Sequence, residues 1–188
     1  MKAVIGYKGL VVCLLTVATG EVFGFDASIA TPAAVPPVYR AIANEHDVPA
    51  DVLYAVALTE SGTHVKALNA RLPWPWTLNI AGKGRYYPTR RQALRAAQDA
   101  FDAGIRSIDL GLMQVNWRYH ADALGSLDSA IDPLHNLTVG ARILATCHAR
   151  RGDWFGALEC YHAPNHPSRA KAYRQRVERA LRQLSAAG

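Results

Sequence analysis

The sequence predicts a mainly helical α+β domain with one small β-hairpin. Apolar residues recur at three-and-four spacing in several segments, which is the period of a helix with one buried face. A single segment, residues 76–87, instead surrounds the turn Ala81-Gly82-Lys83-Gly84 with strand-forming residues, as a hairpin does. The chain has 188 residues, of which 50% are hydrophobic, and this is enough for one domain with a core.

The first residues of the chain predict export. Lys2 and Lys8 precede an apolar run over residues 9–18 that is too short to span a bilayer comfortably. We therefore expect a signal peptide over residues 1–24, and its small residues leave the cleavage site open. An uncleaved membrane anchor is the alternative. A linker rich in proline and alanine is expected over residues 25–37, and the folded domain over residues 38–188.

Prolines and glycines set the predicted boundaries of the first elements. A helix over residues 39–45 is followed by a second helix that has Pro49 in its first turn, carries Glu60 and stops at Gly62. The next stretch is not expected to be helical, because Pro73-Trp74-Pro75 forces extended geometry before the hairpin.

Helices dominate the rest of the predicted domain. Thr89 and Gln92 form a capping box that starts a helix ended by Gly104, and a loop-like segment with a glycine follows over residues 107–117. Further helices are expected from Asp132 to Gly152, from Asp153 to Tyr161, and over residues 168–184.

The cysteines predict one disulfide. Cys13 leaves with the signal peptide, so an exported chain keeps Cys147 and Cys160, an even pair in an oxidising compartment. The alternative is a metal site built from both cysteines with His148 and His162. Its spacing matches no zinc pattern, and we predict neither a metal nor a cofactor.

The formal charge of +6 indicates an anionic surface as partner. The basic residues are dispersed and the compartment is wrong for nucleic acid, so a cell-wall polymer or a membrane surface is favoured. Ordinary solubility is the alternative explanation for this charge.

Glu60 is the leading candidate for a catalytic residue. It ends an apolar run in which positions 52, 56 and 60 share one helical stripe, so a carboxyl group stands where Val would be expected. Burial penalises the charged form, and a buried carboxyl should hold its proton near neutral pH, as a general acid for cleaving an acetal must. The alternative is a solvated residue at a helix end.

The loop-like segment supplies the remaining candidates. Asp109 could stabilise positive charge at a sugar carbon, although a turn residue that caps a local N–H would look the same. Gln114 and Asn116 are separated by one residue, so in extended geometry their amides would point the same way and suit sugar hydroxyl and acetamido groups. Met113 suits a core position as well as a groove, and Tyr161 could provide a flat face for a sugar ring or lie in the core.

Four motifs together carry a resemblance to a known family. They are Thr59-Glu60-Ser61, Gly111-Leu112-Met113-Gln114-Val115-Asn116, Asn136-Leu137-Thr138-Val139-Gly140 and Tyr161-His162-Ala163. In this order, over roughly residues 38–180, the chain resembles the soluble lytic transglycosylase family of the lysozyme-like superfamily. It looks most like the specialised enzymes that accompany secretion and conjugation machineries of Gram-negative bacteria.

The resemblance implies a lysozyme-like fold and roles for individual residues. Glu60 falls on the single acid/base of the family, which cleaves between N-acetylmuramic acid (MurNAc) and N-acetylglucosamine (GlcNAc) and leaves a 1,6-anhydro product. Ser61, Met113, Gln114 and Tyr161 match positions that orient the acid or line the glycan groove. Asp109 falls on the second carboxylate of animal lysozymes. The chain has Tyr161-His162-Ala163-Pro164 where the family usually has Tyr-Asn-Ala-Gly.

These observations predict an exported, monomeric lytic transglycosylase of the periplasm that acts on peptidoglycan strands. Its expected task is to open the wall locally for a secretion or conjugation apparatus. Two alternatives remain: a hydrolytic muramidase that uses Glu60 and Asp109 with water, and a glycan-binding protein without turnover.

Overall fold

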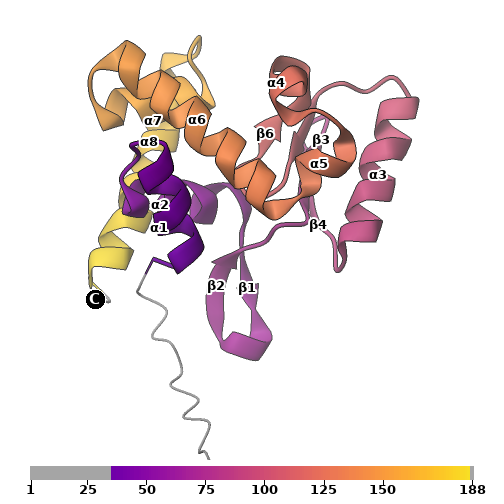
Figure 1. Cartoon of the computed structure of the whole chain (residues 1–188), viewed down its shortest axis with the longest axis horizontal. Coiled ribbons are helices and arrows are strands. Elements are labelled where there is room, and N and C mark those ends of the chain that lie inside the picture. Colours follow the sequence, from indigo (N-terminus) through magenta and orange to yellow (C-terminus); the bar gives the residue numbers. More distant parts are fainter. Residues whose placement is uncertain (1–34, 187–188) are drawn as a thin grey trace, which may run out of the picture.

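The computed structural model describes residues 35–186 as a mainly helical α+β domain, which confirms the predicted fold class (Figure 1). The predicted signal peptide, residues 1–24, and all but the last residues of the predicted linker lie outside the described residues. Within residues 35–186, no helix combines the length and the apolar character that a membrane crossing requires.

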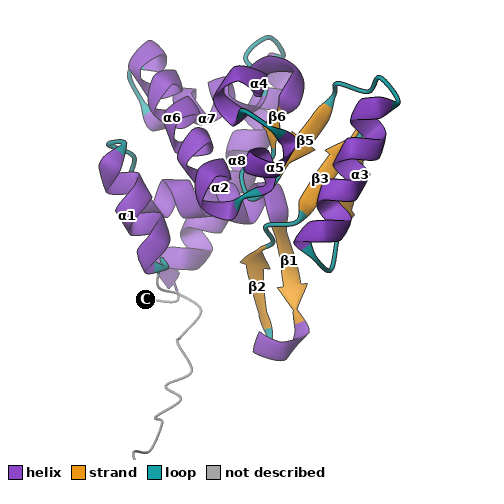
Figure 2. Ribbon diagram, turned by 45° about the vertical axis from the view of Figure 1, so that its right-hand side comes forward, coloured by secondary structure: helices purple, strands orange, loops and turns teal. Residues whose placement is uncertain are grey.

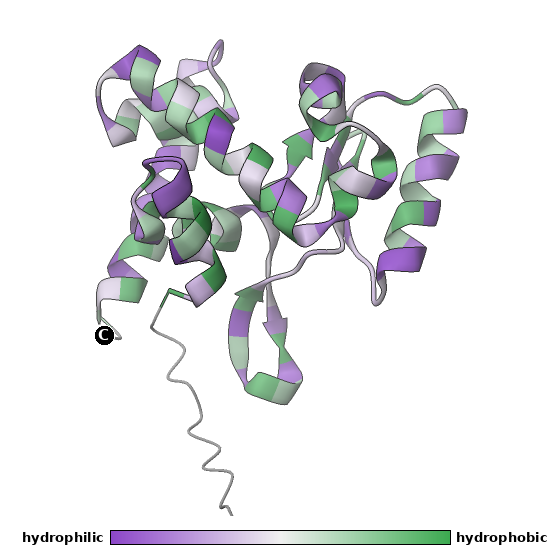
Figure 3. Ribbon diagram, viewed as in Figure 1, coloured by the Kyte–Doolittle hydropathy of each residue, from purple (hydrophilic) through white to green (hydrophobic). Residues whose placement is uncertain are grey.

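Helix α2 (Ala50–Ser61) is the central element of the helical half. Every residue from Val52 to Leu58 is buried, as in a helix at the middle of a core, and the parts of α2 visible behind α1 are largely green in Figure 3, the colour of hydrophobic residues. Helices α1 (Pro37–Glu45) and α8 (Pro167–Ala186) pack against it. Pro49 is the N-cap residue and Gly62 the C-cap residue, close to the predicted ends.

A two-stranded hairpin follows α2 directly, and the sequence analysis did not predict it. Strands β1 (Gly62–Val65) and β2 (Ala70–Pro73) pair antiparallel around the short 3₁₀ turn η1 (Lys66–Leu68) and project from the domain (Figure 1). The hairpin begins at the glycine that ends the helix. A Cβ there would lie 2.2 Å from the carbonyl oxygen of Leu58, so only glycine allows the sharp change from helix to strand.

The predicted hairpin is part of a larger sheet. Strands β3 (Thr77–Ile80) and β4 (Lys83–Tyr86) pair as expected around Ala81 and Gly82, both at positive φ. The segment 107–117, expected to be loop-like, adds two short strands, β5 (Ile108–Leu110) and β6 (Val115–Asn116), in the order β4-β3-β5-β6. The buried Ile108 and Leu110 alternate with Asp109, which is the period of a strand.

Helices cover the sheet and close the domain. Helix α3 (Arg90–Asp102) lies over the sheet, and Thr89 accepts the N–H of Gln92 at its start (Figure 2). The short helices α4 (Trp117–Leu124) and α5 (Leu127–Ile131) lead into α6 (Pro133–Arg151), which starts after Asp132 and ends at Gly152 as predicted.

Helix α7 (Trp154–His162) is fixed to α6 by a covalent bond. A disulfide joins Cys147 of α6 to Cys160 of α7, with 5.7 Å between their Cα atoms, and confirms the predicted pairing. The alternative metal site is therefore wrong, because its two sulfur ligands are bonded to each other. The disulfide also fixes the turn of chain that carries Tyr161 and His162.

Candidate active site

Glu60 lies at the end of α2, where the central helix meets the four-stranded sheet, β1 and α7. Its side chain is only 13% exposed, so the carboxyl group is largely shielded from solvent yet still accessible at one side. Val52 and Val56 on the same stripe are buried in the core. Glu60 lies one helical turn beyond Val56 on this stripe, so the helix places its side chain at the edge of the core.

Three aromatic side chains from α7 and α8 surround the carboxyl group. The imidazole Nδ1 of His162 lies 3.8 Å from Oε1 of Glu60. Burial raises the pKa values of Tyr161 and Tyr173 well above the ordinary range, and the nearby charge of Glu60 raises both further. The buried hydroxyl of Tyr173 has no hydrogen-bond partner of regular geometry within the described residues, although it lies close enough to Glu60 to feel its charge.

Tyr161 uses its hydroxyl to hold the neighbouring loop. It donates a 2.6 Å hydrogen bond to the backbone carbonyl of Met113, and its ring stacks on that of Tyr173. The hydroxyl of Tyr161 is thus already hydrogen-bonded, while the residue is partly accessible. Contact of Tyr161 with a glycan stays a prediction.

Asp109 lies in the same site and is held by two amides. Asn79 on β3 donates to Oδ2 at 2.8 Å, and Asn116 on β6 donates to Oδ1. Burial raises the pKa of Asp109; the bond from Asn116 lowers it, the charge of Glu60 raises it, and Asn79 and His162 lower it. The carboxyl group of Asp109 is thus oriented by the sheet and lies within the field of Glu60.

The loop between β5 and β6 is tied to the end of α2 and to α6. Ser61, fully buried, donates to the carbonyl of Leu112 at 2.7 Å. Asn136, also fully buried, donates to the carbonyls of Leu110 and Ala130 and accepts the N–H of Met113. These bonds fix Glu60 and the loop relative to each other.

Gly111 is required where the loop meets Asn136. It has a φ of +76°, and a Cβ on it would lie 2.5 Å from Cγ of Asn136. Both facts exclude a larger residue, since a positive φ is unfavourable for L side chains and the approach is closer than atoms allow.

The predicted parallel alignment of the Gln114 and Asn116 amides is wrong. Gln114 has a φ of 45°, so it is not extended, and its Nε2 donates to the carbonyls of Thr77 and Gly111. The amide of Asn116 instead orients Asp109. The tight turn between β5 and β6 overrides the alternation that the sequence pattern assumed.

The predicted substrate-binding residues thus differ in what they offer. Ser61 and Met113 are buried and stabilise the loop, while Gln114, Asn116 and Tyr161 are partly accessible. Their contact with substrate stays a prediction, as does the catalytic role of Glu60 and Asp109. Four residues near the site were not predicted as part of it: Asn79, Asn136, His162 and Tyr173.

The sequence held a weak signal for some of them. Asn136 lies in one of the four motifs, and Tyr173 belongs to the apolar stripe of α8. Asn79 pairs across the strands with Asp109, and this register was not evident while residues 107–117 were expected to be a loop. His162 also lies in one of the four motifs, and the sequence suggested a role for its side chain only as an alternative metal ligand.

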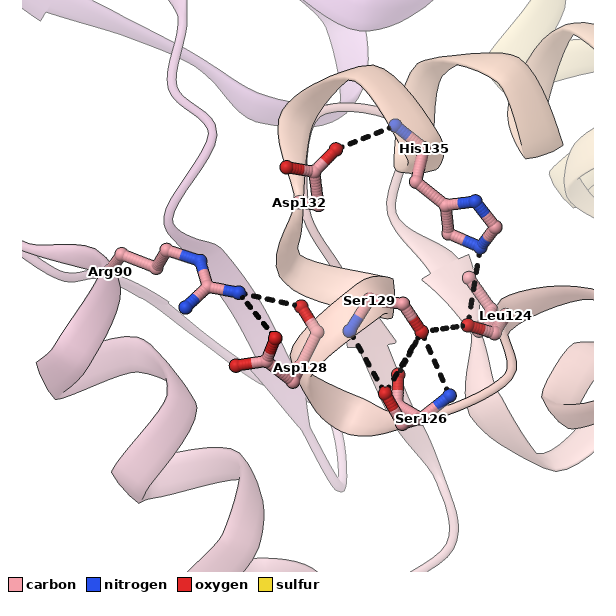
Figure 4. A network of polar contacts seen from close by, with 7 residues as sticks. All are labelled: Arg90, Leu124, Ser126, Asp128, Ser129, Asp132 and His135. Atoms are coloured by element: carbon pink, nitrogen blue, oxygen red, sulfur yellow. Dashed lines mark hydrogen bonds and ion pairs between the residues drawn. The ribbon is translucent and has the colours of Figure 1, made fainter.

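A separate hollow of about 640 Å³ lies between α3, α4 and α5, away from Glu60. Its lining includes Phe101 and Trp117, whose rings meet edge to face. Beside it, Arg90 of α3 binds the carboxylate and the carbonyl of Asp128 on α5, as Figure 4 shows together with the capping bonds of α5. These contacts join the helices over the sheet, and neither Glu60 nor Asp109 lines this hollow.

Within residues 35–186, no group of three or more His, Cys, Asp or Glu side chains is arranged to hold a metal ion. The candidate site offers proton donors, acceptors and charged groups. A shielded carboxyl beside a second carboxyl held by amides can move a proton and stabilise positive charge.

Comparison with known proteins agrees with this chemistry. Residues 37–182 match the family model described as the transglycosylase SLT domain. A search of curated proteins and a search of solved structures each gave no match. The family consists of lytic transglycosylases of the lysozyme-like superfamily, so a match over most of the chain implies a glycan-cleaving enzyme that binds peptidoglycan. The chain belongs to the transglycosylase SLT domain family.

Proposed function

We propose that this protein is a peptidoglycan lytic transglycosylase in which Glu60 acts first as acid and then as base. The observation that carries the proposal is the Glu60 side chain, 13% exposed at the end of a buried helix, with its carboxyl group beside Tyr161, Tyr173 and Asp109. A positioned carboxyl group can donate a proton to a glycosidic oxygen.

The proposed reaction has two steps that balance without an outside reactant. Glu60 gives its proton to the oxygen between MurNAc and GlcNAc, the bond from C1 of MurNAc to that oxygen breaks, and positive charge develops at C1. The Glu60 carboxylate then takes the proton of the 6-hydroxyl of MurNAc, and O6 bonds to C1 to give the 1,6-anhydro sugar. Glu60 ends the cycle protonated, as it began.

Asp109 is proposed to assist by electrostatics. Its carboxylate is oriented by Asn79 and Asn116, so its charge stays in place while positive charge develops on the sugar. The accessible Gln114, Asn116 and Tyr161 would line the glycan groove.

The test is the Glu60→Gln variant, with Glu45→Gln as the matched control on the exposed face of α1. The wild type and the control should lower the turbidity of a purified cell-wall suspension at similar rates. The rate with Glu60→Gln should be lower by about 10²- to 10⁴-fold. The variant should still bind wall in a pelleting assay. Equal clearing by Glu60→Gln and the wild type would refute the assignment.

A hydrolytic muramidase is the second candidate, and Asp109 is the observation that favours it. A second oriented carboxyl could activate water or trap the sugar carbon. Mass spectrometry of the released muropeptides separates the two reactions, because anhydro ends are lighter than hydrolysed ends by one water. We expect anhydro ends, and reducing ends alone would establish the hydrolase.

We further propose that the protein is exported to the periplasm and opens the wall locally for a secretion or conjugation apparatus. This rests on the predicted signal peptide over residues 1–24 and on the resemblance to the specialised subgroup. Deleting the protein should reduce transfer by that apparatus, and Glu60→Gln should fail to restore it. Full transfer by the deletion strain would contradict the role.

A further inference from the structure

His162 faces Glu60 at the candidate site and has a titratable side chain. Its Nδ1 lies 3.8 Å from Oε1 of Glu60, within ion-pair distance, and its side chain is 27% exposed. Solvent protons can therefore reach the imidazole.

The imidazole is held in this position by its surroundings. Its ring lies 4.2 Å from the ring of Tyr173 with an angle of 2° between the planes, a parallel stack against α8. Helix α7, which carries His162, is fixed to α6 by the disulfide at Cys160. The stack on Tyr173 and this disulfide together hold the imidazole next to Glu60 in the folded protein.

The charged and titratable groups that face His162 come from three elements. Glu60 comes from α2, Asp109 from β5 and Tyr173 from α8. Behind the stack, the guanidinium of Arg176 lies 5.4 Å from the ring of Tyr173. Two carboxyl groups therefore face the imidazole, and both would be attracted to its protonated form.

From this geometry we propose that His162 is a positioning residue that, once protonated, holds Glu60 as a carboxylate and so slows the acid step. The inference rests on the proposed role of Glu60 as proton donor. An imidazolium beside a carboxyl favours the ionised carboxylate, which cannot protonate the glycosidic oxygen. When the pair shares one proton, part of the population is the imidazolium–carboxylate form and is inactive.

The pH dependence follows from the states of the pair. A neutral His162 should affect Glu60 no more than a neutral Asn would. A protonated His162 favours the carboxylate form of Glu60, so less protonated Glu60 remains in the population. The kcat of the wild type should therefore fall relative to the kcat of the His162→Asn variant as the pH is lowered from 9 to 6.

The experiment compares wild type, His162→Asn and His162→Gln on soluble glycan strands across this pH range. The ratio of variant to wild-type kcat should be near one at pH 9 and rise to about three- to tenfold at pH 6, with little change in KM. His148→Asn is the matched control, because His148 is also a half-buried imidazole stacked on an aromatic ring, Trp154, but forms no ion pair within residues 35–186. Its ratio should stay constant.

Two results would overturn the inference. Ratios that do not change with pH would mean that His162 acts only through packing, and a ratio below one at pH 6 would mean that the imidazolium helps the reaction. Thermal unfolding of each variant shows whether it is folded at the assay temperature, and the Gln variant serves if Asn is not tolerated. Failure of the proposed acid role of Glu60 looks different, since Glu60→Gln would then cleave the strands as fast as the wild type.

Discussion

Replacing Asn136 tests whether one buried amide holds the loop of the candidate site. Its side chain makes three hydrogen bonds to backbone groups, to the carbonyls of Leu110 and Ala130 and from the N–H of Met113, all within 3.0 Å. The residue is fully buried, so water cannot easily replace these bonds. In Asn136→Ala, three backbone groups lose their partner at once.

The cost can be worked from these contacts. A buried polar group that loses its partner costs ~1 to 3 kcal/mol, and some relaxation is expected, so we expect a total loss of about 3 to 6 kcal/mol. For a domain of this size each kcal/mol lowers Tm by about 2 to 4 °C, which gives a decrease of roughly 6 to 24 °C. Activity should also fall at temperatures at which the variant is fully folded, because the loop aligns Ser61 and Tyr161 with Glu60.

Urea unfolding followed by circular dichroism measures the loss, with Asn44→Ala on the exposed face of α1 as control. The control should change stability by less than about 0.5 kcal/mol. A loss below about 1 kcal/mol in Asn136→Ala would refute the reasoning, because it would mean that the three backbone groups find other partners.

Two other predictions concern stability. Cys147→Ser should lower the free energy of unfolding by ~2 to 5 kcal/mol, since the disulfide to Cys160 constrains the unfolded chain; a thiol titration that finds both cysteines free in the oxidised protein would contradict it. The pKa of Asp109 is raised chiefly by burial, so protonation of Asp109 favours the folded state of the protein. This contribution to the free energy of unfolding is lost as the pH rises through the pKa of Asp109 in the folded state. The wild type should therefore gain Tm relative to Asp109→Asn as the pH is lowered from 7 to 4, and parallel melting curves across this range would show that the sign is wrong.

The helical frame could be predicted from the sequence because its signals are local. Proline at the start, glycine at the end and an apolar stripe between them defined α2 and α6, and Asp132 was recognised as the residue before the latter. The disulfide followed from the number of cysteines and the expected compartment. These features depend on neighbours within a few turns or on composition alone.

The short strands could not be predicted in the same way. Strand β5 is stabilised by pairing with distant residues, as when Asp109 lies opposite Asn79, thirty positions earlier in the chain, and β6 in turn pairs with β5. A run of two or three residues has too little period to reveal a strand. Strands β1 and β2 pair locally, but each has only four residues and no clear alternation of buried and exposed positions.

The spacing of apolar residues was enough to predict that a carboxyl group, that of Glu60, ends a buried helix. The surroundings of that carboxyl group could not be predicted, because Asp109, His162 and Tyr173 lie on elements far from α2 in the chain. Local periodicity fixes which face of a helix is buried. Which groups meet at its end depends on packing and on strand register, and these are properties of the whole fold.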